Sequence, residues 1–251
     1  MKPLFTIATV TYNAEATLER TLRSVALQDY AYIEHLIVDG CSKDRTLSLV
    51  KQYIEENQTP HSIRLISEPD KGLYDAMNKA LLNAKGDYIV FLNAGDCLRN
   101  SDTISLLAQY EEKGSLPAIL YGNTHLVDNE GHFLRLRRLS PPERLTPDSF
   151  LDGMLVCHHS FYVRTDIARQ ELYDLRYRYS ADFDWCIRLM KKAKCLHNTR
   201  LTLIDYLNEG MTTRNHKASL KERFRIMAKH YGWLSTILHH GWFVIRLFYK
   251  P

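Results

Sequence analysis

The sequence has 251 residues, enough for one large α/β domain, or one domain with a smaller extension, around a sizeable core. Its 33 basic and 29 acidic residues make it only mildly basic, and the basic residues lie in patches instead of the continuous stripe expected of a nucleic-acid binder. Five scattered cysteines without a CxxC spacing argue against a disulfide framework and for a reducing, cytosolic compartment. The N-terminus lacks the pattern of a signal peptide and predicts a strand.

The first half of the sequence alternates short apolar runs with helical stripes, which predicts βα units. We expect Asn13 and Asp44 to cap the first two helices and Gly86 to end the third. The expected strands cover 5–10, 35–38, 63–67 and 88–92. The helical stripes between them are Leu18, Leu22 and Val25; Leu47, Val50 and Ile54; and Tyr74, Met77 and Leu81.

Polar residues follow each of these four strands: Asn13, Asp39, Asp70 and Asp96. Right-handed crossovers place the four tips on one edge of a parallel sheet, where ligands of α/β sheets bind. An acidic pocket there suits a metal-bound diphosphate or a polyol. Asn93 and Asp96 can both direct oxygen atoms at a hard cation such as Mg²⁺ or Mn²⁺, although taken alone they are more typical of a turn that closes a strand.

Several motifs occur together in a specific order. Thr11-Tyr12-Asn13 follows the first strand, Asp39-Gly40-x-Ser42-x-Asp44 the second, and Asn93-x-x-Asp96 the fourth. The combination resembles the family-two inverting glycosyltransferases of GT-A fold. The stretch 67–78 is closest to their bacterial surface-polysaccharide branch, which makes O-antigen or colanic-acid-like polymers. The likeness continues through Asp182-x-Asp184 and the segment 209–212, over roughly the first 215 residues.

The resemblance implies an α/β fold of GT-A type, with a Rossmann-like, mostly parallel central sheet flanked by helices, a smaller acceptor-side β-ribbon and C-terminal helices. We expect a glycosyltransferase domain at 1–215. Within it, 1–98 would form the nucleotide-sugar half and 99–215 the acceptor half. Residues 216–251 would form a basic, amphipathic helical extension.

The resemblance also implies roles for residues of the nucleotide-sugar half. Asp39 would hold the uracil ring of a UDP-sugar, Asp70 and Lys71 would lie near the nucleotide, and Asp96 would hold Mn²⁺ or Mg²⁺ on the diphosphate. Thr11, Tyr12, Asn13 and Asn93 would complete the donor site.

The sequence departs from the family pattern at two positions. The first acidic position of the metal motif is occupied by Asn93, which leaves Asp96 as the main ligand. The change is expected to weaken metal binding or to alter which metal is bound. The glycine pair late in the family is Glu209-Gly210, which affects the contact of that loop with the sugar or acceptor.

The second half of the sequence is less regular. Residues 119–126 predict a strand and 132–138 an exposed β-ribbon with its turn at 128–131. Three prolines between 141 and 147 mark a loop suited to an acceptor-binding flap. A further strand is expected at 156–163, where His158 and His159 would point to opposite faces. Either histidine could be a core residue, and the resemblance favours His158 as the acceptor-side one.

Asp182 and Asp184 open a helix that follows Ser180. Two acidic residues in a first turn can simply complement the helix dipole. Inverting sugar transfer, however, requires a carboxylate to take the proton from the attacking hydroxyl, and the resemblance places that base at Asp182. Each residue advances about 100° around a helix, so only one of the two carboxylates can face the pocket. Asp184 would cap the helix or orient an acceptor-side neighbour.

These features predict a UDP-sugar-dependent hexosyltransferase acting on a saccharide linked to a polyprenyl diphosphate, such as undecaprenyl diphosphate. A glycoside hydrolase would also use two carboxylates, but it has no need of the polar residues after the first two strands, which suit nucleotide binding. A sugar nucleotidyltransferase would carry a Gly-rich, Arg-containing loop after the first strand. A degenerate homologue that binds the donor without turnover remains open because of Asn93 and Glu209.

The segment 233–249 is apolar and aromatic but too short and interrupted for a transmembrane helix. It fits an interfacial helix preceded by the basic segment 217–229, and a helix packed onto the domain fits the pattern equally well. The first possibility predicts a cytoplasmic protein that is peripheral on the inner face of the bacterial inner membrane.

Overall fold

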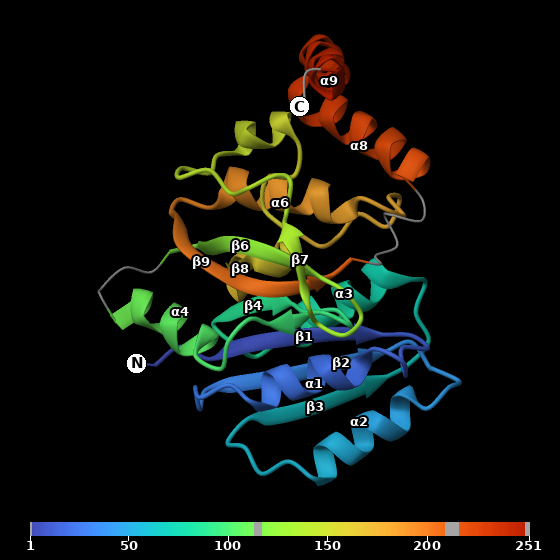
Figure 1. The fold of residues 1–251 in the computed structure, drawn as a ribbon, viewed down its shortest axis with the longest axis vertical. Coiled ribbons are helices and arrows are strands. Elements are labelled where there is room, and N and C mark those ends of the chain that lie inside the picture. The colour runs from blue at the N-terminus through green and yellow to red at the C-terminus, as the bar shows by residue number, and fades with distance from the viewer. Residues whose placement is uncertain (1, 113–116, 209–215, 249–251) are drawn as a thin grey trace.

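A computed structural model shows an α/β fold in which helices cover both faces of a twisted sheet (Figure 1). The structure describes residues 2–112, 117–208 and 216–248. The predicted fold class is confirmed. The strands are β1 (Phe5–Thr11), β2 (Ile33–Asp39), β3 (Ser62–Ser67), β4 (Tyr88–Phe91), β5 (Cys97–Leu98), β6 (Ile119–Val127), β7 (Phe133–Leu136), β8 (Phe161–Arg164) and β9 (Leu196–Leu207).

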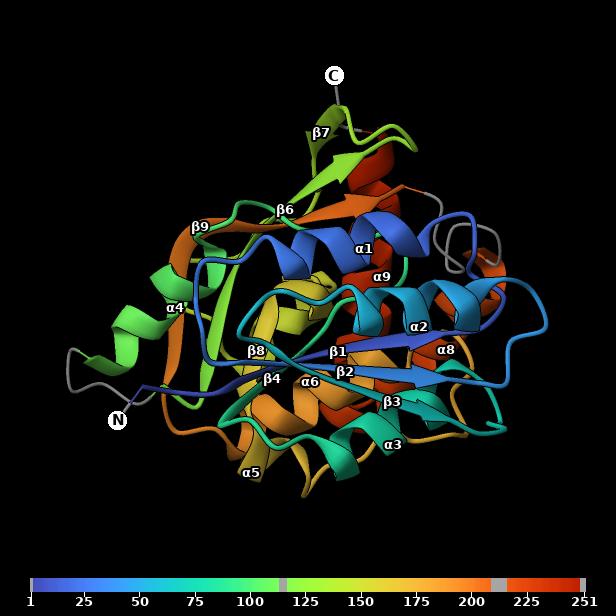
Figure 2. The ribbon, with the colours of Figure 1, turned by 90° about the horizontal axis from the view of Figure 1, so that it is seen from below.

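The helices lie on opposite sides of the sheet, with the first two on one face and the third and sixth on the other (Figure 2). Two short 3₁₀ turns, η1 and η2, lie between β7 and β8. The helical elements are α1 (Leu18–Ala26), α2 (Thr46–Glu55), α3 (Leu73–Asn83), α4 (Thr103–Glu112), η1 (Pro147–Asp152), η2 (His158–Ser160), α5 (Thr165–Ala168), α6 (Ala181–Lys192), α8 (His216–Tyr231) and α9 (Trp233–Phe248).

The first four strands run parallel in the order β3-β2-β1-β4. Every residue of β1, β2 and β4 is buried, because the sheet is covered on both faces. The carboxyl ends of these strands therefore meet at one edge, as predicted. β1 and β2 end in register, with Thr11 beside Asp39.

The second half extends the sheet with mixed pairing. β8 is antiparallel to β4 and to β6, whereas β6 is parallel to β9. The predicted strand at 119–126 and the exposed ribbon are confirmed, since β7 pairs antiparallel with β6 around the turn at 128–131. No strand is predicted from the sequence at the position of β9. Register shifts along β6, and the left-handed backbone of Arg200 (φ 60°), make the long β9 pairing irregular.

The strand predicted at 156–163 is wrong in its first half. His158–Ser160 forms η2, and β8 begins only at Phe161. The reason is tertiary: the Ser160 hydroxyl bonds to the Thr124 hydroxyl of β6 at 2.6 Å, and the Ser160 N–H donates to the Cys157 carbonyl. The two histidines are therefore not on opposite faces of a strand.

Two predicted helix signals act differently from expectation. Asn13 does not cap α1; its backbone is left-handed (φ 50°), and its Oδ1 accepts the Lys43 N–H, which ties together the loops after β1 and β2. Gly86 does not end α3, which stops at Asn83. A Cβ at Gly86 would lie 2.5 Å from the Thr6 backbone nitrogen, so glycine is needed there for close strand approach. Asp44 does accept the N–H of Thr46 at the start of α2.

α8 packs on α6, and α9 continues from α8 after Gly232 (φ 83°). Phe224 of α8 contacts Trp233 and His240 of α9. The boundary predicted at residue 215 lies outside the described residues. Among those that are described, no helix has the length and apolar character needed to cross a membrane.

Candidate active site

Asp39 lies at the tip of β2 and is fully buried. Its carboxylate accepts hydrogen bonds from the Thr11 hydroxyl (3.1 Å), the Ser67 hydroxyl (3.1 Å), and both the backbone N–H (2.9 Å) and hydroxyl (2.5 Å) of Ser42. A carboxylate has about four acceptor sites, so these four donors satisfy it within the protein. Asp39 therefore joins the tips of the first three strands into one rigid corner.

Asp70 approaches the same corner from the loop after β3. A Cβ added to Gly40 would lie 2.2 Å from the Asp70 carboxylate and 3.4 Å from the Tyr12 ring, so both side chains lie next to Gly40. Tyr12 is 60% exposed and offers an open aromatic ring beside the carboxylate. Lys71 is exposed, and its backbone N–H donates to Asp75.

Asp96 follows β4 in a tight turn that includes Gly95 (φ 103°). It is buried, and its Oδ1 accepts the Leu207 N–H from the end of β9 at 2.8 Å. Its Oδ2 lies 2.8 Å from Nδ1 of His159. The contact lacks hydrogen-bond geometry, so among the described residues neither ring nitrogen of His159 has a hydrogen-bond partner, and neither does the buried Oδ1 of Asn93.

Asp182 lies in the first turn of α6 and is only 8% exposed. Its Oδ1 accepts the Tyr74 hydroxyl at 3.1 Å, and its Oδ2 lies 3.2 Å from Nδ1 of His158. Burial by itself would raise the pKa of Asp182, but hydrogen bonding to His158 and the positive charge of Arg223 outweigh it and lower the pKa to about 2. The carboxylate is therefore ionised at neutral pH.

His158 and His159 connect these two carboxylates. Their ring centroids are 3.9 Å apart, with His158 on Asp182 and His159 on Asp96. Burial and the charge of His159 lower the pKa of His158 against the opposing effect of Asp182. A neutral His158 can donate from Nδ1 to Asp182. The residues predicted as base and metal ligand, 86 positions apart in the sequence, thus share one center.

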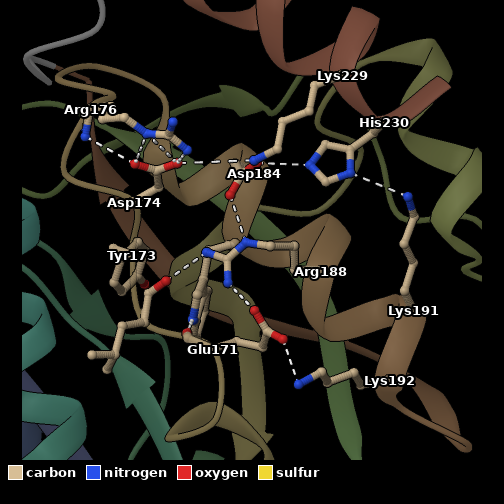
Figure 3. Close-up of polar contacts among 12 residues, drawn as sticks. Glu171, Tyr173, Asp174, Arg176, Asp184, Arg188, Lys191, Lys192, Lys229 and His230 are labelled. Carbon is tan, nitrogen blue, oxygen red and sulfur yellow. Dashed lines mark hydrogen bonds and ion pairs between the residues drawn. The ribbon is translucent and has the colours of Figure 1, made fainter. Parts of the chain in front are cut away.

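Asp184 faces away from this center. It is fully buried and contacts Arg188 Nε at 2.7 Å, Lys229 Nζ at 3.0 Å and His230 Nε2 at 2.8 Å, as Figure 3 shows. Burial would raise its pKa, but these partners hold the pKa well below the usual range. Asp184 therefore binds α6 to α8. Glu209, the other residue expected on the acceptor side, lies outside the described residues.

Sequence reasoning did not assign site contacts to Tyr74 and His159. Tyr74 is part of the apolar stripe of α3, and its hydroxyl reaches Asp182 only because α3 and α6 pack on the same face of the sheet. His159 was recognisable only as the neighbour of His158. The sequence signal that could have identified both residues is a polar atom on an otherwise apolar segment, since a buried hydroxyl or imidazole needs a hydrogen-bond partner.

A cavity of about 200 Å³ lies between β6, the segment after β7 and the approach to η2. Cys157, immediately before His158, lines it together with Asn123 and Arg137. The Arg137 guanidinium donates to the Met154 and Leu155 carbonyls, which fixes this wall of the cavity. The predicted proline-containing loop contributes Pro141 to the lining of the cavity.

A metal would fit the Asp96 tip better than the ribbon turn. In the described part of the chain, a single group of three histidine, cysteine or acidic side chains lies close enough to share an ion. It consists of Asp128, Glu130 and His132. They are largely exposed, and local hydrogen bonds to Asp128 account for their arrangement. At the Asp96 tip, by contrast, buried polar atoms of Asn93 and His159 have no hydrogen-bond partner in the part of the chain that the structure describes, which suits added cation ligation.

Residues 6–171 match the glycosyl transferase family 2. The match spans well over half of the chain and includes the tips of β1 to β4 and both histidines. The chain belongs to this family. The predicted family and the general activity of a glycosyltransferase are therefore confirmed, whereas the surface-polysaccharide branch is not.

Two relatives of this glycosyltransferase are named for different biosynthetic pathways. It is 28% identical over 226 residues to TuaG of Bacillus subtilis, which is named for teichuronic acid biosynthesis, covering 89% of this chain and 87% of that one. It is 30% identical over 187 residues to a PGL/p-HBAD biosynthesis glycosyltransferase of Mycobacterium tuberculosis, covering 74% and 69%.

Two solved structures share the fold. TarS of S. aureus (residues 1–349), in complex with UDP-GlcNAc, superposes with a TM-score of 0.71 at 19% identity, over 89% of this chain and 64% of that one. The mannosyltransferase PcManGT of Pyrobaculum calidifontis, in complex with GDP-Man and Mn²⁺, has a TM-score of 0.63 at 17% identity, over 95% and 74%. At these identities the likeness shows the GT-A-like fold.

Proposed function

We propose that this glycosyltransferase moves a hexose from a UDP-sugar, with inversion and with a divalent metal, onto a saccharide carried by a polyprenyl diphosphate. The product would enter a bacterial surface polysaccharide such as O-antigen or an exopolysaccharide. The observation that carries the proposal is the Asp182–His158–His159–Asp96 center. It combines an ionised carboxylate with a second carboxylate at the strand tips where a nucleotide sugar would bind.

In the proposed reaction the acceptor hydroxyl oxygen attacks the anomeric carbon as the bond to the β-phosphate oxygen breaks. Asp182 takes the hydroxyl proton, and UDP leaves with the bonding electrons. Tyr74 and His158 occupy one direction on each Asp182 oxygen, which fixes the carboxylate plane and leaves acceptor capacity on both atoms. The carboxylate is thus oriented before the acceptor binds.

Asp96 would hold Mn²⁺ or Mg²⁺, with the Asn93 amide oxygen and the His159 imidazole available as further ligands. The Asn93 Oδ1 and the His159 nitrogens make no hydrogen bond to any described residue, which supports this assignment. When bound, the cation would stabilise charge on the diphosphate leaving group. Because Mg²⁺ commonly takes only one or two carboxylates, the replacement of the family's acidic residue by Asn93 is compatible with metal use.

Asp39, Asp70 and Tyr12 would form the nucleotide corner, with Thr11, Asn13 and Lys71 around it. The exposed Tyr12 ring offers a stacking surface for the base. Asp39 can accept the uracil imide hydrogen if a rotatable hydroxyl of Ser42 or Ser67 turns away from it. A site that makes this hydrogen bond would discriminate against bases lacking the donor, because a buried partner would be left unpaired.

We predict that Asp39→Ala raises the KM for the UDP-sugar about tenfold with a smaller change in kcat. Ser67→Ala is the matched control, since it removes one donor to Asp39 and keeps the carboxylate. Initial rates at varied donor concentration measure both. Donor affinity that is unchanged in Asp39→Ala contradicts the assignment of uridine recognition to this residue.

The acceptor would approach from the side of His158 and the cavity beside it. Its lipid part would remain in the membrane, which gives α9 a role. Trp233, Leu234, Ile237, Leu238 and Trp242 of α9 are exposed, and α8 is rich in lysine and arginine. An anionic leaflet attracts such basic residues by about 1 kcal/mol each, and the apolar side chains can enter the interface. We propose peripheral binding to the cytoplasmic face of the inner membrane.

We expect removal of residues 233–251 to release the protein from anionic vesicles and to leave activity on a short, soluble acceptor. Leu234→Ser with Leu238→Ser should weaken vesicle binding without disturbing packing, because both side chains are exposed. Leu82→Ser, at an equally exposed leucine of α3, is the control. Cosedimentation with vesicles measures the effect. If the double variant binds as wild type does, α9 is not the membrane contact.

A degenerate homologue that binds the donor without turnover is the second candidate, favoured by Asn93 and Glu209. A labelled UDP-sugar separates the two, since only an enzyme transfers the label. Screening UDP-glucose, UDP-galactose and their acetamido forms against a synthetic lipid-diphosphate acceptor tests the proposed function. Binding of a donor with no transfer to any acceptor would favour the degenerate homologue.

A further inference from the structure

Helix α8 holds the segment that leads into α6, on which Asp182 lies. The Glu222 carboxylate accepts three consecutive backbone N–H groups, those of Arg178 (2.8 Å), Tyr179 (2.7 Å) and Ser180 (3.0 Å). Ser180 is the residue that immediately precedes α6. Glu222 therefore fixes the backbone two residues before Asp182.

Ser180 does not cap its own helix. Its hydroxyl instead contacts the Ser219 hydroxyl of α8 at 3.0 Å. Serine at this position ordinarily accepts a hydrogen bond from the first turn of its helix. Here its side chain adds to the attachment of α8, so the start of α6 depends on another helix for its position.

The same face of α8 binds the other side of the first turn of α6. Lys229 and His230 contact Asp184, as Figure 3 shows. Ser219, Glu222, Ile226 and His230 recur at spacings of three and four residues, which places them on one face of α8. Ile226 is fully buried in the core that includes α6. Asp182 thus lies between two attachment points.

We propose that α8 positions the catalytic base, with Glu222 as its main positioning residue. This inference rests on the proposed role of Asp182. Glu222 does not touch Asp182; it acts by holding residues 178–180, so that the carboxylate keeps its place against Tyr74 and His158. A displacement of about 1 Å in a catalytic group can cost about 10²-fold in rate. Helix α8 would therefore support the active site, beyond any role at the membrane.

The test is Glu222→Gln. An amide replaces one acceptor oxygen with a donor, so at least one of the three N–H groups loses its partner. We expect kcat to fall about tenfold to 100-fold with the donor KM nearly unchanged. Hydrogen exchange of the amides at 178–180 should accelerate about tenfold or more, while β1 to β3 stay protected. Leu220→Ala, at a nearby exposed position of α8, should change neither quantity.

A double-mutant cycle separates positioning from a general loss of structure. If Glu222 acts through Asp182, Glu222→Gln should alter kcat less than about twofold in an Asp182→Asn background. Equal losses in both backgrounds, or wild-type kcat in Glu222→Gln, overturn the inference. If the wild-type chain transfers no sugar, the proposed function fails. The exchange experiment then decides this inference, because unchanged exchange at 178–180 refutes the attachment itself.

Discussion

Replacing Asp182 with asparagine is expected to lower kcat by about 10²–10⁴-fold with donor binding nearly unchanged. Asparagine keeps the size and the hydrogen bond from Tyr74 but cannot accept the acceptor proton. The carboxylate is buried and ionised, and its pKa of about 2 reflects the His158 hydrogen bond and the charge of Arg223 outweighing burial. Rates at saturating acceptor measure the loss.

Asp184→Asn is the matched control for this substitution. Asp184 is two residues away on the same helix turn, is also buried, and is bound to Arg188, Lys229 and His230. Losing its charge leaves the Arg188 guanidinium and the Lys229 ammonium without their full partner, so the effect should appear mainly as a lower Tm. An α-linked UDP-sugar should give a β-glycoside, which NMR of the product identifies. A reversed ranking of the two variants, or an α-linked product, would show that the base or the mechanism is wrong.

Chelation of divalent metal is expected to abolish transfer, and Mn²⁺ or Mg²⁺ should restore it. Asp96→Ala should weaken Mn²⁺ binding in the presence of UDP by about tenfold or more, since even residues that only support metal ligands cost 10–100-fold. Paramagnetic resonance titration of free Mn²⁺ measures binding without reliance on activity. Full activity of wild type in chelator, or of Asp96→Ala in any buffer, excludes this assignment.

The same Mn²⁺ complex tests His159. Nitrogen coupling to the bound ion, detected by electron spin echo, should be present in wild type and lost in His159→Ala. His132→Ala, in the exposed ribbon turn beside Asp128 and Glu130, is the control and should keep both coupling and affinity. Coupling that disappears only in His132→Ala would show that the metal binds at the ribbon turn instead of at Asp96.

Local sequence patterns predicted the nucleotide half of the fold. Uninterrupted apolar runs such as 88–92 are typical of strands buried on both faces, and the alternating helical stripes impose parallel pairing and a common edge for the polar tips. Periodicity and chain order were therefore sufficient to place Asp39, Asp70 and Asp96 on one edge. The pattern was less informative for β9, whose pairing with β6 shifts register and passes through the left-handed Arg200.

Tertiary packing decided the site contacts. The adjacent histidines suggested a strand with opposite-facing rings, but the bonding of Ser160 to Thr124 turns this segment into η2 and brings both rings to the two carboxylates. Helix periodicity separated Asp182 from Asp184 without telling which one faces the site. Contacts between distant segments determine which carboxylate faces the site. Helix α3 brings Tyr74 to Asp182, whereas α8 brings Lys229 and His230 to Asp184.

The order of the motifs thus indicates the family, and local periodicity predicts the α/β class and the edge of the sheet that carries the polar tips. Which side chains meet at that edge, and the support that α8 gives to the start of α6 through Glu222, depend on packing between segments far apart in the chain. A carboxylate that accepts backbone N–H groups from a distant segment leaves no signature in local sequence, because any residue except proline supplies the donor.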